Sequence, residues 1–376
     1  MWPRVLHVAE TIKGGIASYL EEILPYQTSQ FGPDGVGLLI PASQLDELPS
    51  ARGVQVWTFD DSCSRPRRVL RIWKALPGVI AAHRPNVIHV HGTFAGFATR
   101  MPFMSSRVPV VYCSHGWAFD RESSGLKNKL IAAVERVLAP FAAVIVCISR
   151  HDYRSGLRAG IPARLLRLVE NGIADQGEQK VGNNGDWRCT FLFAGRFDRQ
   201  KGVDIFIEAM RRMPADCIGV LLGGAVLAEE ALSDVPPNVV VRGWAPREEV
   251  QDQISRADAL VMPSRWEGFG LTALEAMRAS KPVIAAGVGG LSDLIVDGYN
   301  GRIVQPNSVD ALVEAMCAGN RESLAEMGRN GRRFYLESYT AQKLNRALFR
   351  VYLEALGQAQ APASLHEKQW RGVPAR

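Results

Sequence analysis

The chain lacks the patterns that mark membrane-spanning or disulfide-rich proteins. Its longest apolar run, residues 137–148, has only 12 positions and contains Pro140, whereas a spanning helix needs about 20. The N-terminus reaches Glu10 without a long apolar core, which favours a first strand over a signal peptide. The six cysteines form no Cys-x-x-Cys pair. We therefore expect buried, reduced thiols in a cytoplasmic protein.

Three phosphate-binding motifs are also missing. The absence of Gly-x-Gly-x-x-Gly argues against a dinucleotide oxidoreductase, and the absence of Gly-x-x-x-x-Gly-Lys-Ser/Thr excludes a P-loop. No two aspartates stand at Asp-x-Asp spacing, so a metal clamped on a substrate diphosphate is unsupported. The sequence thus predicts no metal and no cofactor, and positive side chains or helix termini would have to neutralise a bound phosphate.

Excess positive charge is confined to the first half of the chain. Residues 1–170 carry 20 Lys and Arg against 13 Asp and Glu, and the remainder carries 24 against 25. This asymmetry predicts that the first half meets an anionic lipid surface, a phosphorylated substrate or nucleic acid. Nucleic acid has the least support, because the basic residues lack an interleaved aromatic platform.

Short β-branched runs alternate with helical stretches in two successive series. Such strands with helical crossovers predict parallel sheets covered on both faces, and therefore an α/β protein with two doubly wound, Rossmann-like domains. A segment rich in Gly and Asn, residues 172–187, predicts the linker. The expected strands are residues 5–8, 36–40, 54–57, 87–90, 108–113, 143–148 and 165–169, then 190–194, 218–222, 239–241, 259–262, 282–286 and 302–304.

The first informative cluster is GRFDRQKG, residues 195–202, between an expected strand and an expected helix over residues 203–213. It places Arg196 and Lys201 at a helix N-terminus, where fixed charges and free backbone N–H groups suit an anionic diphosphate. Two exposed basic residues in a turn are an equally weighted alternative at this stage.

The second cluster is EGFGLTALE, residues 267–275, with an expected helix over residues 271–279. Gly268 and Gly270 would let a ligand approach the backbone, while Glu267 and Glu275 could bind neutral sugar and ribose hydroxyls. The alternative is an ordinary helix N-terminal acid and an exposed helix residue.

These clusters resemble the Gly-Arg-x4-Lys-Gly and Glu-x7-Glu signatures of glycosyltransferase family 4, retaining enzymes with the two-domain GT-B fold. Further matching segments run along residues 4–357 and include KGG at 13–15, VIHVHG at 87–92, HG at 115–116, ENGI at 170–173 and DGYNG at 297–301. The resemblance implies an N-terminal acceptor domain, residues 1–172, and a nucleotide-sugar domain, residues 173–340, facing a central cleft. It also implies a helix, residues 341–357, that returns to the first domain; residues 358–376 are expected to be a flexible tail.

The resemblance also implies roles at matching positions. His115 would lie by the donor sugar, and Arg196 and Lys201 would bind the diphosphate; together with Glu267 these form the expected catalytic set. Donor-binding positions implied by the family are Gly14, Gly15, Arg196, Lys201, Glu267, Gly268, Phe269, Gly270, Leu271, Thr272 and Glu275. Ser280 stands where the family usually has Gly, and LGGA at 222–225 is a shortened form of its Gly-rich turn.

One expected helix, beginning near Ser64-Arg65-Pro66, carries basic and apolar residues on opposite sides. A solvated basic side on a covering helix is one interpretation. The other is that the basic side lies on anionic lipid, which the resemblance favours because the family often extends lipid-linked glycans. The candidate membrane-facing residues are Arg67, Arg68, Arg71 and Lys74.

Together these patterns predict a retaining, metal-independent glycosyltransferase. It would move a sugar from a nucleotide-diphosphate sugar, UDP-linked first and GDP-mannose second, to a lipid-linked glycan in bacterial surface polysaccharide synthesis. It would be cytoplasmic and peripheral at the inner face of the membrane. A sugar-nucleotide epimerase on the same fold and a non-catalytic nucleotide-sugar-binding protein are the alternatives; the latter would more plausibly have lost Arg196, Lys201 or Glu267.

Overall fold

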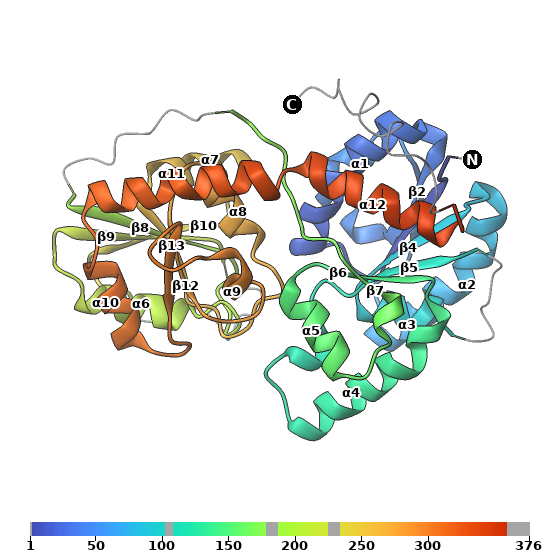
Figure 1. Ribbon diagram of the computed structural model, residues 1–376, viewed down its shortest axis with the longest axis horizontal. Helices are drawn as coiled ribbons and strands as arrows, with labels where there is room; N and C mark the ends of the chain where they lie inside the picture. The colour runs from blue at the N-terminus through green and yellow to red at the C-terminus, as the bar shows by residue number, and fades with distance from the viewer. Residues whose placement is uncertain (1, 102–107, 178–186, 225–233, 359–376) are drawn as a thin grey trace. The chain divides into compact units, whose positions relative to one another are not determined.

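The computed structural model describes residues 2–101, 108–177, 187–224 and 234–358. Its contacts divide the chain into two units, residues 1–174 with 341–376, and residues 175–340. Figure 1 shows that each unit is a sheet with helices packed against it. The centre of the expected linker, residues 178–186, and the tail from residue 359 lie outside the described residues.

Unit 1 contains a seven-stranded sheet in the order β3-β2-β1-β4-β5-β6-β7, with every neighbouring pair parallel. The order reverses direction between β1 and β4, which is where doubly wound sheets place their ligands. The strands are β1 (Val5–Ala9), β2 (Val36–Pro41), β3 (Gln55–Phe59), β4 (Val87–His91), β5 (Val110–Cys113), β6 (Val144–Cys147) and β7 (Leu166–Leu168).

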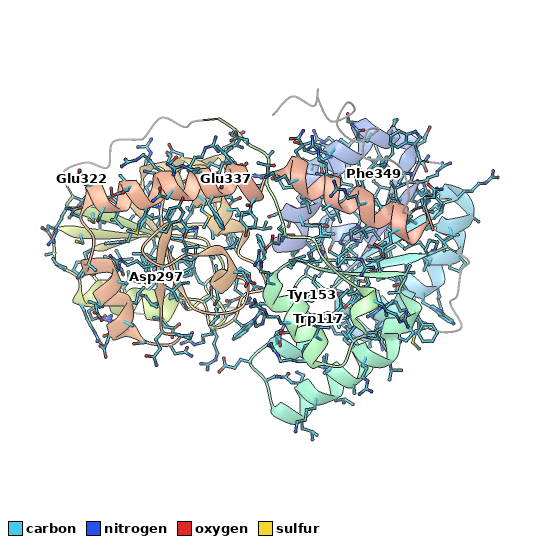
Figure 2. All side chains as sticks on the ribbon, in the orientation of Figure 1. Trp117, Tyr153, Asp297, Glu322, Glu337 and Phe349 are labelled. Atoms are coloured by element: carbon cyan, nitrogen blue, oxygen red, sulfur yellow. The ribbon has the colours of Figure 1, made fainter. Side chains whose placement is uncertain are left out.

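Helices cover this sheet, so its strands read as nearly continuous apolar runs. A C-terminal helix, α12, also belongs to this unit, and its Tyr352 hydroxyl accepts a hydrogen bond from Gln27 at 3.0 Å. Figure 2 labels Phe349 on the same helix. The α-helices of the unit are α1 (Gly15–Phe31), α2 (Arg65–His83), α3 (Thr93–Thr99), α4 (Gly125–Leu138), α5 (Arg150–Arg158) and α12 (Ala341–Ala355).

Unit 2 contains a six-stranded parallel sheet in the order β10-β9-β8-β11-β12-β13, which reverses between β8 and β11. Its strands are β8 (Cys189–Ala194), β9 (Cys217–Leu222), β10 (Val239–Gly243), β11 (Ala259–Met262), β12 (Val283–Ala286) and β13 (Gly301–Val304). Its helices are α6 (Val203–Arg212), α7 (Arg247–Arg256), α8 (Leu271–Arg278), α9 (Leu291–Leu294), α10 (Val309–Cys317) and α11 (Arg321–Ser338).

The predicted α/β class is confirmed, and each of the thirteen expected strands corresponds to a strand of the structure within a few residues. Ser280, which replaces a usual glycine, has a left-handed φ of 58°. That conformation explains why glycine is favoured there, since a side chain in it is strained. Within the described residues, no helix combines the length and apolar content needed to cross a bilayer.

Candidate functional site

In unit 2, the loop between β8 and α6 holds Arg196 in a defined position. The guanidinium lies 2.9 Å from a carboxylate oxygen of Asp198 and donates to the Gln200 amide oxygen at 2.8 Å. The adjoining Gly-rich turn supports this loop: a Cβ on Gly223 would stand 1.8 Å from the carbonyl oxygen of Gly195. Arg196 is therefore preorganised at the carboxyl end of a strand; Ala225, the last residue of that turn motif, is outside the described part of the chain.

Lys201 and Glu267 come from different strand-end loops and meet directly. The Lys201 ammonium nitrogen lies 2.5 Å from a Glu267 carboxylate oxygen, and the two side chains are 20% and 11% exposed. Such a mostly desolvated pair is sensitive to loss of either partner. The structure therefore brings together two residues that the sequence assigned to different parts of a donor molecule, the diphosphate and the sugar.

The backbone around Glu267 leaves no room for larger residues. A Cβ on Gly289 would lie 1.7 Å from the Glu267 carbonyl oxygen, and the Gly290 N–H donates to that oxygen at 3.2 Å. Gly270 is the N-cap of α8 with φ of 100°, and no side chain caps this end. The first N–H groups of α8, at Leu271 and Thr272, therefore have no intrahelical partner.

The rest of this segment has mixed exposure. Phe269 is buried and packs edge-on against Tyr339, with ring centroids 6.1 Å apart. Its side chain anchors the turn, so only its backbone is available to a ligand. Gly268 and Glu275 are half-buried.

In unit 1, Gly14 and Gly15 are exposed at the start of α1, and an added Cβ at either would meet no atom within 4 Å. Gly14 is the N-cap with φ of 71°, and no side chain caps the helix. This end of α1 thus offers open backbone N–H groups, the arrangement that suits an anion.

His115 follows β5 in a strained left-handed conformation, φ of 55°. Its ring is half-buried and lies edge-on to Tyr19 of α1, with ring centroids 4.8 Å apart. Gly116, which follows His115, donates its backbone N–H to the buried Asp152. Burial raises the pKa of Asp152 to about 7. The strain at His115 is therefore held by contacts on both sides of the loop.

Three more residues connect His115 to the interior through a chain of hydrogen bonds. His115 Nε2 lies 2.9 Å from His91 Nδ1, His91 Nε2 lies 3.0 Å from His7 Nδ1, and His7 Nε2 lies 2.7 Å from the Gln27 amide oxygen. Burial lowers the pKa of each of the three imidazoles, to about 4 for His7 and about 3 for His115. All three rings are consequently neutral at pH 7.

Each neutral ring carries one N–H proton, so each ring donates one hydrogen bond and accepts another, and all the hydrogen bonds in the series must run in the same direction. Gln27 donates its amide N–H to Tyr352 and must therefore accept from His7 Nε2. It follows that His91 donates to His7 and that His115 donates from Nε2 to His91. The Nδ1 atom of His115 is then left with its lone pair, ready to accept a hydrogen bond from a hydroxyl.

Two of these histidines, with His89, form a group that could hold a metal ion. One ring nitrogen from each of His7, His89 and His91 lies within 4.8 Å of the others, and all three side chains are buried. His89 Nδ1 pairs with the Tyr352 hydroxyl at 2.8 Å, whereas its Nε2 has no partner. The 3.0 Å contact between His7 and His91 is a hydrogen bond, and a metal would have to displace its proton.

The candidate membrane-facing helix α2 packs its apolar residues Ile72, Leu76 and Val79 into the core. Two of the four basic candidates have acidic partners: Arg68 lies 3.3 Å from Glu10, and Arg71 lies 3.6 Å from Asp60. The other two, Arg67 and Lys74, are exposed.

Sequence reasoning missed the supporting residues. Gln200 orients Arg196. Arg265, in the loop after β11, binds Asp204 at the start of α6 with N–O distances of 2.9 and 2.6 Å. His7, His91 and Gln27 are far apart in the chain, so no local motif marks them. The alternation of His89 and His91 on an apolar strand was the one available signal.

Two family descriptions match the chain. Residues 14–172 match the glycosyl transferase 4-like domain, and residues 188–319 match the glycosyl transferases group 1. Together these matches cover most of both units.

Individual relatives agree with these matches. An uncharacterised 41.2 kDa protein in the cps region of Klebsiella pneumoniae is 28% identical over 325 residues, 83% of this chain and 88% of that protein. An Escherichia coli UDP-Gal:α-D-GlcNAc-diphosphoundecaprenol α-1,3-galactosyltransferase is 24% identical over 61% of this chain and 65% of that protein. The structure of Anabaena HepE in complex with UDP and glucose is 20% identical, covers 93% of this chain and 99% of that one, and has a TM-score of 0.74.

Proposed function

Because the chain belongs to the family 4 glycosyltransferases with the GT-B fold, we propose that it is a retaining, metal-independent hexosyltransferase. Its donor is a UDP-sugar, and its acceptor is a lipid-linked glycan of a bacterial surface polysaccharide. The observation that carries the donor site is the Lys201–Glu267 pair just before the uncapped N-terminus of α8, with Arg196 held in the loop of Lys201 by Asp198 and Gln200.

The chemistry requires stabilisation of a nucleotide diphosphate as it leaves. Arg196 and Lys201 supply positive charge at the ends of β8 and its loop, and the N–H groups at the start of α8 supply the positive end of a helix dipole. These groups are the alternative to a metal ion. The Glu267 carboxylate, already an acceptor toward Lys201, is placed to accept hydroxyls of the transferred sugar.

We assign His115 to binding rather than to proton transfer. Its lowered pKa keeps the ring neutral, and the hydrogen bond from Nε2 to His91 leaves the Nδ1 lone pair as an acceptor for a sugar hydroxyl. In front-face transfer the departing phosphate oxygen takes the acceptor proton, so no separate general base is needed. Glu267 as a covalent nucleophile is disfavoured, because its pairing with Lys201 lowers its nucleophilicity.

Two kinds of relative support the substrate choice. The E. coli relative takes UDP-galactose and a diphosphoundecaprenol-linked acceptor, and the K. pneumoniae relative is encoded in a cps region. The E. coli relative supports a uridine nucleotide and a lipid-linked acceptor, and the K. pneumoniae relative supports only a place in a cps region.

Thermal-shift measurement with UDP, GDP and ADP tests the nucleotide, since a ligand that binds only the folded state raises the unfolding temperature. We expect UDP to give the largest shift. Transfer from radiolabelled UDP-sugars to diphosphate-lipid-linked acceptors, with anomeric analysis of the product, then tests the reaction. A larger shift with GDP would reassign the donor, and an inverted product would overturn the retaining mechanism.

A further inference from the structure

Helix α4 presents large apolar side chains to solvent along one side. Leu126, Leu130 and Val137 are 81%, 65% and 68% exposed, and Val134 is 38% exposed. Isolated exposed leucines are ordinary, but a contiguous row on a single helix marks an interaction surface. Phe141, in the turn that follows the helix, is also exposed.

The opposite side of α4 is firmly held. Glu135 is buried and accepts from the Arg100 guanidinium at 2.8 Å and from the Tyr112 hydroxyl at 2.9 Å. The Arg100 guanidinium also lies 3.7 Å from the Tyr112 ring centroid. Because this buried network fixes how α4 is rotated about its own axis, the apolar row on the opposite side must face solvent. Figure 1 shows α4 at the outer edge of unit 1.

The charges on α4 complete the pattern. Lys127, Lys129 and Arg136 are exposed, and the only acid of the helix is the buried Glu135. At about 100° per residue, Leu126, Leu130 and Val137 fall within roughly 40° of one another, with Lys127 on one side of them and Lys129 and Arg136 on the other. An apolar stripe bordered on both sides by basic residues is the arrangement of a helix that lies in a lipid interface.

We propose that the α4 stripe, defined as Leu126, Leu130, Val134 and Val137 with the bordering Lys127, Lys129 and Arg136, docks on an anionic phospholipid bilayer. The apolar side chains enter the headgroup region, and the basic side chains reach outward to lipid phosphates. The proposal rests on the proposed function only in that a lipid-linked acceptor requires access to a membrane.

The charges favour lipid over a second copy of the chain. Two α4 stripes packed against each other would bring six exposed basic residues together with no exposed acid on either helix. A bilayer with anionic headgroups instead neutralises them, at up to about 1 kcal/mol per basic residue near the surface.

The stripe also refines the expectation for α2. That helix has most of its apolar residues in the core and two of its basic residues paired with acids. Leu70, 45% exposed, is its one large apolar side chain on the surface, so α2 offers exposed charge but no row of apolar side chains. Helix α4, the first α-helix after His115, has both exposed basic side chains and a row of exposed apolar side chains.

Flotation of the full chain with phosphatidylethanolamine–phosphatidylglycerol vesicles tests the proposal. We expect wild type to float, less so at high salt. Changing Leu126, Leu130 and Val137 together to Ser should lower the partition coefficient about tenfold or more. Changing Lys127 and Lys129 to Ser should lower it several-fold and weaken its salt dependence.

The matched control changes Leu157, Val296 and Leu336 to Ser; these are 41%, 46% and 42% exposed and lie off α4. This control should float like wild type even if its unfolding temperature falls, since its side chains are more than half buried; the α4 variants should unfold at wild-type temperature because their changed side chains are mostly exposed. Equal flotation of wild type and the α4 variants would overturn the proposal. So would loss of flotation only in an Arg67→Ser/Lys74→Ser variant, or α4-dependent dimerisation in sedimentation without vesicle binding.

Activity separates this proposal from the proposed function. The Leu126/Leu130/Val137 variant should keep transfer to a detergent-dispersed acceptor and lose it selectively for acceptor embedded in vesicles. Absence of transfer in wild type with every acceptor, together with intact α4-dependent flotation, would refute the proposed function and leave the docking surface standing.

Discussion

The ion pair between Lys201 and Glu267 predicts that stability and activity can be separated at the donor site. Each partner is replaced alone, Lys201→Met and Glu267→Gln, and then both together. A single replacement leaves the other group with no charge partner in a place where the side chains are only 20% and 11% exposed. Breaking a fully buried pair costs about 3–5 kcal/mol, and the partial exposure here reduces the expectation to about 2 kcal/mol.

That loss corresponds to a fall of about 4–8 °C in the unfolding temperature of a unit of this size. The double variant removes both charges, so its unfolding temperature should return most of the way to wild type. Activity should not return, because a diphosphate clamp needs the Lys201 charge itself. We expect kcat/KM to fall about a hundredfold in both Lys201→Met and the double variant.

The measurements are thermal unfolding by circular dichroism and initial rates of sugar transfer. The exposed pair Arg256–Asp252 in the same unit, with side chains 50% and 47% exposed, serves as the control. Its Arg256→Met variant should change stability by less than about 1 kcal/mol. Recovery of activity in the double variant would refute the diphosphate assignment, and unchanged unfolding of both single variants would refute the structural role of the pair.

Four further results are expected. Arg196→Ala should lower kcat/KM about a hundredfold with an unchanged unfolding temperature, and near-normal turnover would remove Arg196 from the clamp. Transfer should survive EDTA, and metal analysis of the purified protein should find no stoichiometric ion; loss restored by manganese or magnesium would show a metal-dependent reaction. His91→Phe should raise KM for the donor while transfer remains measurable, because His91 positions His115 without touching substrate. An unchanged KM would show that the hydrogen bond between His91 and His115 is only structural. Stability should fall on acidification, because His7 titrates near pH 4 when folded and near 6.5 when unfolded, so the unfolded chain binds more protons between these values. The contribution of His7 to the free energy of unfolding falls by about 2 kcal/mol between pH 7 and 5. Asp152, whose pKa is raised, acts in the opposite direction. The free energy of unfolding of His7→Gln, measured in urea, should therefore depend less on pH than that of wild type.

Much of the fold was predictable because its signals are local. The central parallel strands are buried on both faces and must be continuous apolar runs. Edge strands such as β3 and β10 are more exposed, and their β-branched residues were the signal that located them. Glycines in left-handed or tightly packed positions, such as Gly270 and Gly289, also leave a direct mark, because no larger residue fits there.

Some features of the site follow from residues that are neighbours in the sequence, and others depend on residues far apart in it. Arg196 and Lys201 lie on the same strand-end loop, and their placement at a helix N-terminus follows from the order of strand, loop and helix alone. The pairing of Lys201 with Glu267 spans 66 positions of sequence. No local pattern specifies it, because a sheet order that reverses at β8 and β11 is what brings the two loops together.

Tertiary structure alone decided which faces of the helices are covered. From periodicity, α2 and α4 are both amphipathic helices with basic residues, and either could present its apolar side to the core. In the folded chain α2 buries most of its apolar side, whereas the Arg100–Glu135–Tyr112 network fixes α4 so that Leu126 and Leu130 face solvent. The sequence by itself determined the fold class and the chemistry of the donor loops, since these depend on neighbours along the chain. The hydrogen bonds from His115 to Gln27 and the exposure of the α4 stripe depend on contacts between distant segments, which only the packed structure specifies.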